Sequence, residues 1–288
     1  MKKTSNWITF VIVHVAFMGV WGALVEIPEK NGFPATLGFV AWAISMIPAA
    51  VAGLFYNKWK VETDVRAIVL GSLAGLLGAV GQLVLFLTLK IAPAYLVFPL
   101  LSLTPVVTVL LAVVFLKEKT GRLGWIGIGV AIAAIFLLSY QPAGDNGNAV
   151  RNSWMLLAAI PLFAWGAQGF VMRFANEKMK AESIFFYMTV TSVVLIPAAL
   201  YMTDFSQQIN WGLSGPYLAM MIQLLNAFGA LFLVYAFRYG KVIIVSPMIN
   251  ALAPVITIVL SLLLYRVVPN KVVAAGMVLA AGAFYLLS

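Results

Sequence analysis

Residues 94–118 read AYLVFPLLSLTPVVTVLLAVVFLKE, an apolar stretch long enough to cross a lipid bilayer. Two prolines, Pro99 and Pro105, lie about midway along it. Proline lacks a backbone N–H and clashes with the preceding turn, so we expect this helix to be kinked or locally opened. Because lipid offers no partner for a freed carbonyl, such a helix is expected to face protein or a water-filled cavity.

A second copy of this stretch lies near the C-terminus. Residues 242–266 read VIIVSPMINALAPVITIVLSLLLYR, in which Pro247 and Pro254 correspond to the first pair of prolines. The runs after the second proline match closely, because PVVTVLL at 105–111 stands against PVITIVL at 254–260. Proline-interrupted spans at matching positions of two halves are typical of a transporter whose binding site lies between repeats.

Composition places the whole chain in a membrane. Of its 288 residues, 63% are hydrophobic and only 9% are charged, whereas a soluble domain carries about 25% charged residues. The net charge of +9 does not indicate nucleic-acid binding, because the basic residues lie in short loops between apolar spans. The absence of cysteine excludes disulfides and thiol chemistry.

Apolar spans of about twenty residues divide the chain into about ten predicted transmembrane helices, five in each half. A polar linker between the fifth and sixth spans is the clearest boundary in the chain. The predicted spans are Trp7–Val25, Pro34–Phe55, Ala67–Leu89, Ala94–Leu116, Leu123–Tyr140, Ser153–Phe174, Ile184–Met202, Pro216–Phe237, Val242–Tyr265 and Val272–Leu287.

Short matches at a nearly constant offset indicate that the two halves are an internal duplication. IPAA occurs at 47–50 and again at 196–199, and Trp21-Gly22-Ala23 recurs as Trp165-Gly166-Ala167. Because five spans is an odd number, the second half must enter the membrane from the opposite side, which makes the repeats inverted. We therefore expect a first repeat at 1–141, a linker at 142–152 and a second repeat at 153–288.

Loop charges predict the orientation. With the N-terminus inside, thirteen of the 18 basic residues lie in the inner loops, and positive charge favours the cytoplasmic side. We expect a multi-pass protein of the cell (inner or plasma) membrane with both termini in the cytoplasm. The five basic residues on the outer side are Lys30, Lys90, Arg151, Arg266 and Lys271.

The layout resembles the drug/metabolite transporter superfamily, and within it the EamA family. The resemblance is carried by the Trp-Gly pairs at 21–22 and 165–166, by the two proline helices, and by Lys117-Glu118 at the end of the first proline helix. The second proline helix departs from this pattern, because it ends in Tyr265-Arg266-Val267 without a glutamate. The resemblance implies ten helices around a central cavity and alternating access for the export or exchange of small metabolites.

Polar side chains within the spans are candidates to line the transport path, because such groups are costly in lipid and usually face the bundle interior. Each of these side chains could instead form a structural hydrogen bond between two helices. For His14 the alternatives are a substrate contact, a proton carrier and a neutral imidazole bonded to a neighbouring helix. The candidate substrate-binding residues are His14, Trp21, Gln82, Ser102, Trp165, Gln168, Gln223, Asn226, Ser246 and Asn250, and the candidate hinges are Pro99, Pro105, Pro247 and Pro254.

No acidic or basic residue lies near the middle of a predicted span, so the sequence favours a small neutral or zwitterionic substrate over a strongly charged one. With one histidine and no cysteine, catalysis and a metal centre are not expected, and no cofactor is expected. The alternative function is a flippase for a lipid-linked or amphipathic substrate. The sequence leaves open whether the protein is a monomer or a homodimer.

Overall fold

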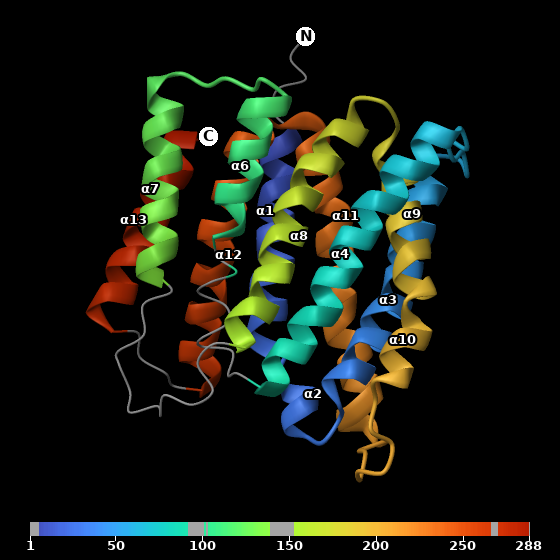
Figure 1. The fold of residues 1–288 in the computed structure, drawn as a ribbon. Helices are drawn as coiled ribbons and strands as arrows, with labels where there is room; N and C mark the ends of the chain where they lie inside the picture. Colours follow the sequence, from blue (N-terminus) through green and yellow to red (C-terminus); the bar gives the residue numbers. More distant parts are fainter. Residues whose placement is uncertain (1–5, 92–100, 102, 139–152, 266–269, 288) are drawn as a thin grey trace.

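The computed structural model describes residues 6–91, 101, 103–138, 153–265 and 270–287, and within these residues the regular structure is entirely helical (Figure 1). In the first half the helices are α1 (Asn6–Leu24), α2 (Ile27–Lys30), α3 (Ala35–Tyr56), α4 (Val65–Ile91), α6 (Thr104–Phe115) and α7 (Arg122–Leu138). In the second half they are α8 (Ser153–Asn176), α9 (Ala181–Val194), α10 (Ile196–Tyr201), the π-helical turn η1 (Leu213–Tyr217), α11 (Leu218–Tyr239), α12 (Val242–Tyr265) and α13 (Lys271–Leu287).

The described helices confirm the prediction of about ten membrane spans. Six are long and apolar enough to cross a membrane, and four shorter apolar helices occupy the positions of the remaining predicted spans. The seventh predicted span is divided, because α9 ends at Val194 and α10 begins at Ile196. Pro197 lies in the first turn of α10, where its missing N–H has no partner to lose.

The two proline helices differ from each other. Pro105 lies in the first turn of α6, after a turn at Leu103, so it begins a helix instead of interrupting one. Pro247 and Pro254 lie inside α12, which is one continuous helix. Proline cannot donate to the carbonyl four residues earlier, so Pro254 leaves the Asn250 carbonyl without its helical partner. Pro99 lies outside the described residues.

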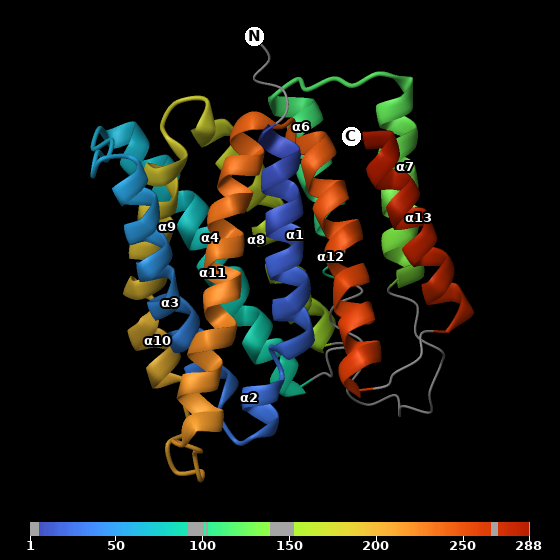
Figure 2. The same cartoon turned by 180° about the vertical axis from the view of Figure 1, so that it is seen from behind.

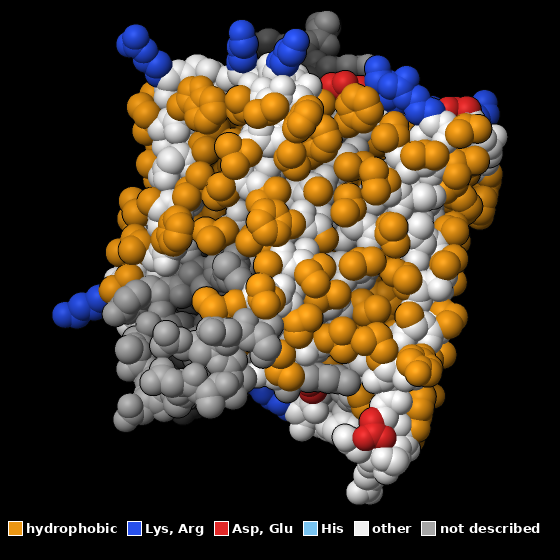
Figure 3. Space-filling model, viewed as in Figure 1, with side chains coloured by type: hydrophobic (Ala, Val, Ile, Leu, Met, Phe, Trp, Pro, Cys, Tyr) orange, Lys and Arg blue, Asp and Glu red, His pale blue; other side chains and the backbone are white. Residues whose placement is uncertain are grey.

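On the face shown in Figure 3, apolar side chains cover the side of the bundle and most charged side chains lie at its two ends. The mean hydropathy of the chain is +1.03, which fits a surface that faces lipid. We call the end where α1 begins the basic end, because loops rich in Lys and Arg meet there (Figure 1). These loops carry Lys58, Lys60, Lys117, Lys119, Arg122, Lys178, Lys180 and Lys241.

The two halves interlock through their first helices. Helix α1 lies between α11 and α12 of the second half (Figure 2), and α8 packs on α4 and α6 of the first half. Each first helix therefore contacts the third and fourth spans of the opposite half. Helix α1 starts at the basic end and α8 ends there (Figure 1), so the two first helices run in opposite directions. This arrangement is that of inverted repeats.

Glycines allow the two first helices to approach their neighbours closely. A Cβ added to Gly19 would lie 2.4 Å from Ile256 Cβ, and one added to Gly166 would lie 2.5 Å from Val107 Cβ. Ile256 and Val107 occupy matching positions after Pro254 and Pro105. Gly19 therefore corresponds to Gly166, and helix contacts of this kind in membranes depend on small residues.

This correspondence corrects the pairing of Trp21 with Trp165 that the shared Trp-Gly letters suggested. With Gly19 matched to Gly166, the residue that corresponds to Trp165 is Met18. A Cβ on Gly81 would meet Trp165 Nε1 at 2.5 Å, and one on Gly229 would meet Met18 Sδ at 3.2 Å. The close helix contacts determine which positions of the two repeats correspond. The repeated Trp-Gly pair is shifted from this correspondence by about one helical turn.

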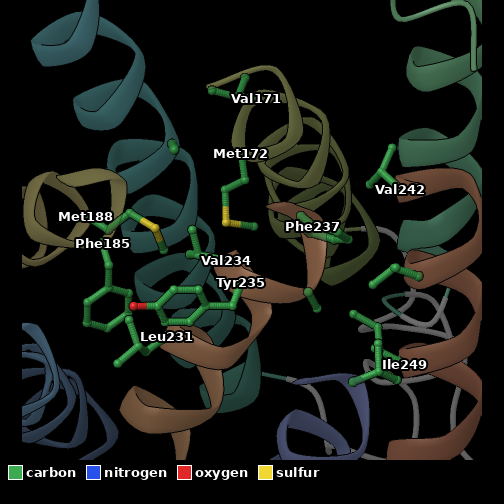
Figure 4. Close-up of a cluster of buried hydrophobic side chains, with 14 of the residues drawn as sticks. Val171, Met172, Phe185, Met188, Leu231, Val234, Tyr235, Phe237, Val242 and Ile249 are labelled. Carbon is green, nitrogen blue, oxygen red and sulfur yellow. The ribbon is translucent and has the colours of Figure 1, made fainter. Parts of the chain in front are cut away.

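A buried apolar cluster joins helices of both halves, and the part drawn in Figure 4 has side chains from α8, α9, α11 and α12. Phe185 and Phe237 are almost completely buried in it, as is Met172. Tyr235 points its hydroxyl out of α11 toward Phe185 in the same view. Each such side chain stabilises the packing through dispersion contacts rather than through exclusion of water alone.

Candidate transport site

Two tryptophan–amide pairs connect helices of the first half to α11. Trp21 Nε1 on α1 donates to Gln223 Oε1 at 3.0 Å, and Trp42 Nε1 on α3 donates to Asn226 Oδ1 at 2.8 Å. All four side chains are buried. Gln223 and Asn226 lie three residues apart, so they occupy adjacent turns of one helical face. Each pair supplies the partner that a buried indole N–H and a buried amide oxygen require.

His14 forms the next contact along the same two helices. Its Nδ1 lies 2.8 Å from the carbonyl oxygen of Gly229, and the side chain is only 6% exposed. A carbonyl oxygen can only accept, so Nδ1 carries the proton of this hydrogen bond. His14 is thereby held in one orientation, with Nε2 as its remaining polar atom.

The opposite half has a matching set of contacts between α8 and α4. Trp165 Nε1 donates to the Gly78 carbonyl at 3.2 Å, and Gln168 Nε2 donates to the Ala74 carbonyl at 3.0 Å. A Cβ on Gly78 would come within 2.2 Å of Gln168 Nε2, so the small residue makes room for the amide. These bonds run from the first helix of one half to the third span of the other, as the Trp21 bond does.

Gln82 is one turn beyond Gly78 on α4 and is the exception to this pattern. Its side chain is 4% exposed, and its Nε2 makes no hydrogen bond among the described residues. A buried donor without a partner costs about 1–3 kcal/mol. Such a group is rare in native proteins and often marks a site where a ligand or water completes the bonding.

Ser246 and Asn250 lie on either side of Pro247 in α12. The Asn250 amide donates to the Ser246 carbonyl at 3.0 Å, and the Ser246 side chain is 3% exposed. The side-chain bond is local to α12, so it does not join two helices. Ser102, the remaining candidate, lies outside the described residues.

The structure also shows buried polar residues that were not chosen from the sequence. Trp42 is not among the candidates named from the sequence, and its hydrogen bond to Asn226 makes it part of the set of contacts on α11. Glu182 is 8% exposed at the start of α9 and accepts a hydrogen bond from the Tyr235 hydroxyl at 2.6 Å. It was missed because the predicted span began at residue 184, two positions later.

A depression of about 470 Å³ lies at the end opposite the basic end. It is formed where the α2–α3 loop meets the loop before η1, and Asn210 Nδ2 donates there to the Asn31 carbonyl at 2.8 Å. These residues are exposed or only partly buried and lie away from the tryptophan–amide pairs. We therefore do not include the depression in the candidate site.

The fold and the site define a membrane transporter built from two inverted repeats. The model of the EamA-like transporter family matches residues 5–140 and again residues 152–288. The chain therefore belongs to the EamA-like transporter family, and the expected resemblance is confirmed.

Two curated relatives each match about half of the chain. An uncharacterized transporter in the cobO 3′ region of Sinorhizobium sp. is 27% identical over 140 residues, which are 47% of this chain and 98% of that protein. An uncharacterized protein of Methanocaldococcus jannaschii, MJ1333.1, is 36% identical over 129 residues, which are 44% of this chain and 92% of that protein. Relatives of this length correspond to a single repeat.

A solved structure supports the fold across nearly the whole chain. A protein described only as "Crystal structure of protein" superposes with a TM-score of 0.76 and covers 96% of this chain and 97% of its own. The sequence identity is 17%, so this likeness concerns the fold alone.

Proposed function

We propose that the protein exports or exchanges a small neutral or zwitterionic metabolite by alternating access between its two repeats. The observation that carries the proposal is the unpartnered Nε2 of Gln82 within a core whose other candidate amides are bonded. A substrate oxygen would complete the bonding of this donor. The candidate side chains are His14, Trp21, Gln82, Trp165, Gln168, Gln223, Asn226, Ser246 and Asn250, with the prolines of α6 and α12 as hinges.

The chemistry of these groups supports the substrate class. The candidates are amide, indole, imidazole and hydroxyl groups, which recognise carbonyl, hydroxyl and amino groups without a fixed full charge. The acidic side chains that are buried among the described residues, Glu182 at 8% exposed and Glu118 with a side chain 7% exposed, both lie near the basic end. They lie away from Gln223 and so do not change the expected substrate class.

Membership of a transporter family supports transport rather than catalysis, and the two-fold arrangement of helices supports alternating access. In this mechanism the halves rock about a site at their interface. We propose that the N- and C-termini face the cytoplasm, because the basic end carries most of the loop lysines and arginines.

The test is counterflow in proteoliposomes against a panel of neutral and zwitterionic metabolites, with and without a pH gradient. Exchange of one class of solute supports the proposal. Absence of exchange for every solute, together with transfer of a labelled lipid-linked substrate across the bilayer, would replace it with the flippase function.

Gln82→Leu locates the site once a transported solute is known. Loss of one hydrogen bond to the substrate is worth about 0.5–1.5 kcal/mol, so we expect the half-saturation concentration to rise by about two- to tenfold. Gln208→Leu is the matched control, because Gln208 is exposed in the loop before η1. A Gln82→Leu protein that binds and transports like the parent would remove Gln82 from the site.

A further inference from the structure

Glu118 forms a buried junction at the basic end. Its Oε1 accepts a hydrogen bond from Arg173 Nε at 2.9 Å, and its Oε2 accepts one from the backbone N–H of Ile243 at 3.2 Å. The side chain of Glu118 is 7% exposed and that of Arg173 is 21% exposed. Charge-assisted bonds that are shielded from water are among the stronger polar interactions in proteins.

The junction connects the two halves at their inner ends. Glu118 belongs to the turn between α6 and α7, Arg173 to the last turn of α8, and Ile243 to the first turn of α12. The carboxylate therefore also lies at the N-terminus of α12, where a negative charge is favourable. A second contact joins the same elements, because Lys241 Nζ donates to the Lys119 carbonyl at 2.5 Å.

The turn itself holds Glu118 in place. Lys117 has a φ of +53°, a left-handed conformation that non-glycine residues seldom adopt. The N–H of Glu118 donates back to the Ala112 carbonyl at 3.3 Å. A residue in this conformation costs about 1–3 kcal/mol and persists only where the surroundings enforce it.

The sequence does not carry the same pair of residues at the corresponding positions of the other repeat. By the repeat correspondence of Thr108 with Thr257, Glu118 corresponds to Val267, and by that of Gly166 with Gly19, Arg173 corresponds to Glu26. Valine and glutamate do not form an ion pair. Glu26 instead pairs with Lys30 on its own helix turn, at 2.8 Å.

We propose that Glu118, Arg173 and the N–H of Ile243 form a latch that holds the basic end closed and opens when the transporter turns toward that side. The proposal rests on the alternating access of the proposed function. Removing Arg173 leaves the carboxylate of Glu118, which is 7% exposed, without its counterion, and this is strongly unfavourable in the closed state. Removing Glu118 leaves Arg173 with only its longer contact to Glu177, at 3.6 Å. Loss of either partner should therefore shift the population toward the form open at the basic end.

The absence of cysteine from the chain makes the opening directly measurable. Ser246 lies one turn deeper in α12 than Ile243 and is 3% exposed, so Ser246→Cys places a small thiol behind the latch. Its modification by a membrane-impermeant maleimide is followed in vesicles of both orientations. Ser192→Cys, buried on α9 away from α12, is the control thiol.

We expect Glu118→Gln and Arg173→Gln to raise the labelling rate of Ser246→Cys from the basic end about fivefold or more, the lower bound for a coupling of 1–3 kcal/mol. Labelling of Ser192→Cys should not change. Arg122→Gln is the matched control, because Arg122 is an exposed cation in the same turn. The double variant should label no faster than the quicker single variant, because both changes break one interaction.

Unchanged labelling in both single variants would overturn the latch. Arg173→Lys keeps the charge, so its labelling rate should lie between the rates of the parent and of Arg173→Gln. This intermediate rate, together with elution of each variant as a single species, shows that faster labelling is not caused by misfolding. The measurement needs no substrate. Faster labelling without transport of any solute would therefore support the latch and contradict the proposed function. Transport of a solute with unchanged labelling would support the proposed function and contradict the latch.

Discussion

Thr108 and Thr257 make the same pair of hydrogen bonds in the two halves. The hydroxyl of Thr108 lies 3.0 Å from the Gly166 carbonyl and 3.3 Å from the Thr104 carbonyl. The hydroxyl of Thr257 lies 2.9 Å from the Gly19 carbonyl and 3.3 Å from the Ala253 carbonyl. Both threonines join the fourth span of one half to the first helix of the other.

We expect Thr108→Val and Thr257→Val each to lower the stability of the protein by about 0.6 kcal/mol and by no more than about 1.7 kcal/mol, the average and the maximum for interhelical hydrogen bonds in membranes. Valine keeps the shape of threonine and removes only the hydroxyl. Thermal unfolding in detergent measures the effect. Thr189→Val is the control, because the Thr189 hydroxyl bonds only within its own helix, to the Phe185 carbonyl at 2.9 Å. Equal losses in all three variants would show that the cross-helix bonds have no special weight.

Gly19→Ala and Gly166→Ala should separate the first helices from their neighbours. The added methyl group would lie within 2.5 Å of a branched side chain in each case, and such overpacking costs about 1–3 kcal/mol. Gly129→Ala on α7 should instead be neutral or stabilising by up to about 1 kcal/mol, because nothing lies within 4 Å of its Cβ position and alanine favours the helix. Unfolding midpoints of the three variants test this order, and a Gly166→Ala protein as stable as Gly129→Ala would contradict it.

The sequence predicted the fold well because the bilayer limits the choices. Span length follows from membrane thickness, and every backbone group must be bonded within a helix. The rotation of each helix about its axis is not determined by these constraints. The partner of Trp21 was therefore not predictable, since Gln223 is 202 positions away, and the ion pair of Glu118 with Arg173 depends on the shape of a single turn.

Trp42→Phe should destabilise the protein by leaving the Asn226 oxygen without its donor. An unsatisfied buried acceptor costs about 1–3 kcal/mol. Asn226→Leu in the Trp42→Phe background should restore part of the loss, because both partners are then apolar. A double-mutant cycle on the unfolding free energy measures the coupling of the two residues. Additive single effects would mean that the 2.8 Å contact contributes nothing of its own.

His14→Asn should retain transport, because an asparagine amide can reproduce the donor at Nδ1 that bonds the Gly229 carbonyl. His14→Leu removes the donor and leaves that carbonyl without this bond, so its transport rate should fall. Because a charged imidazole is costly at a position that is only 6% exposed, we expect flux in proteoliposomes to be the same with and without a pH gradient. The measurement compares both variants with the parent under each condition. Flux that follows the gradient in the parent and ceases to do so in His14→Asn, with substrate binding kept, would make His14 the proton carrier instead.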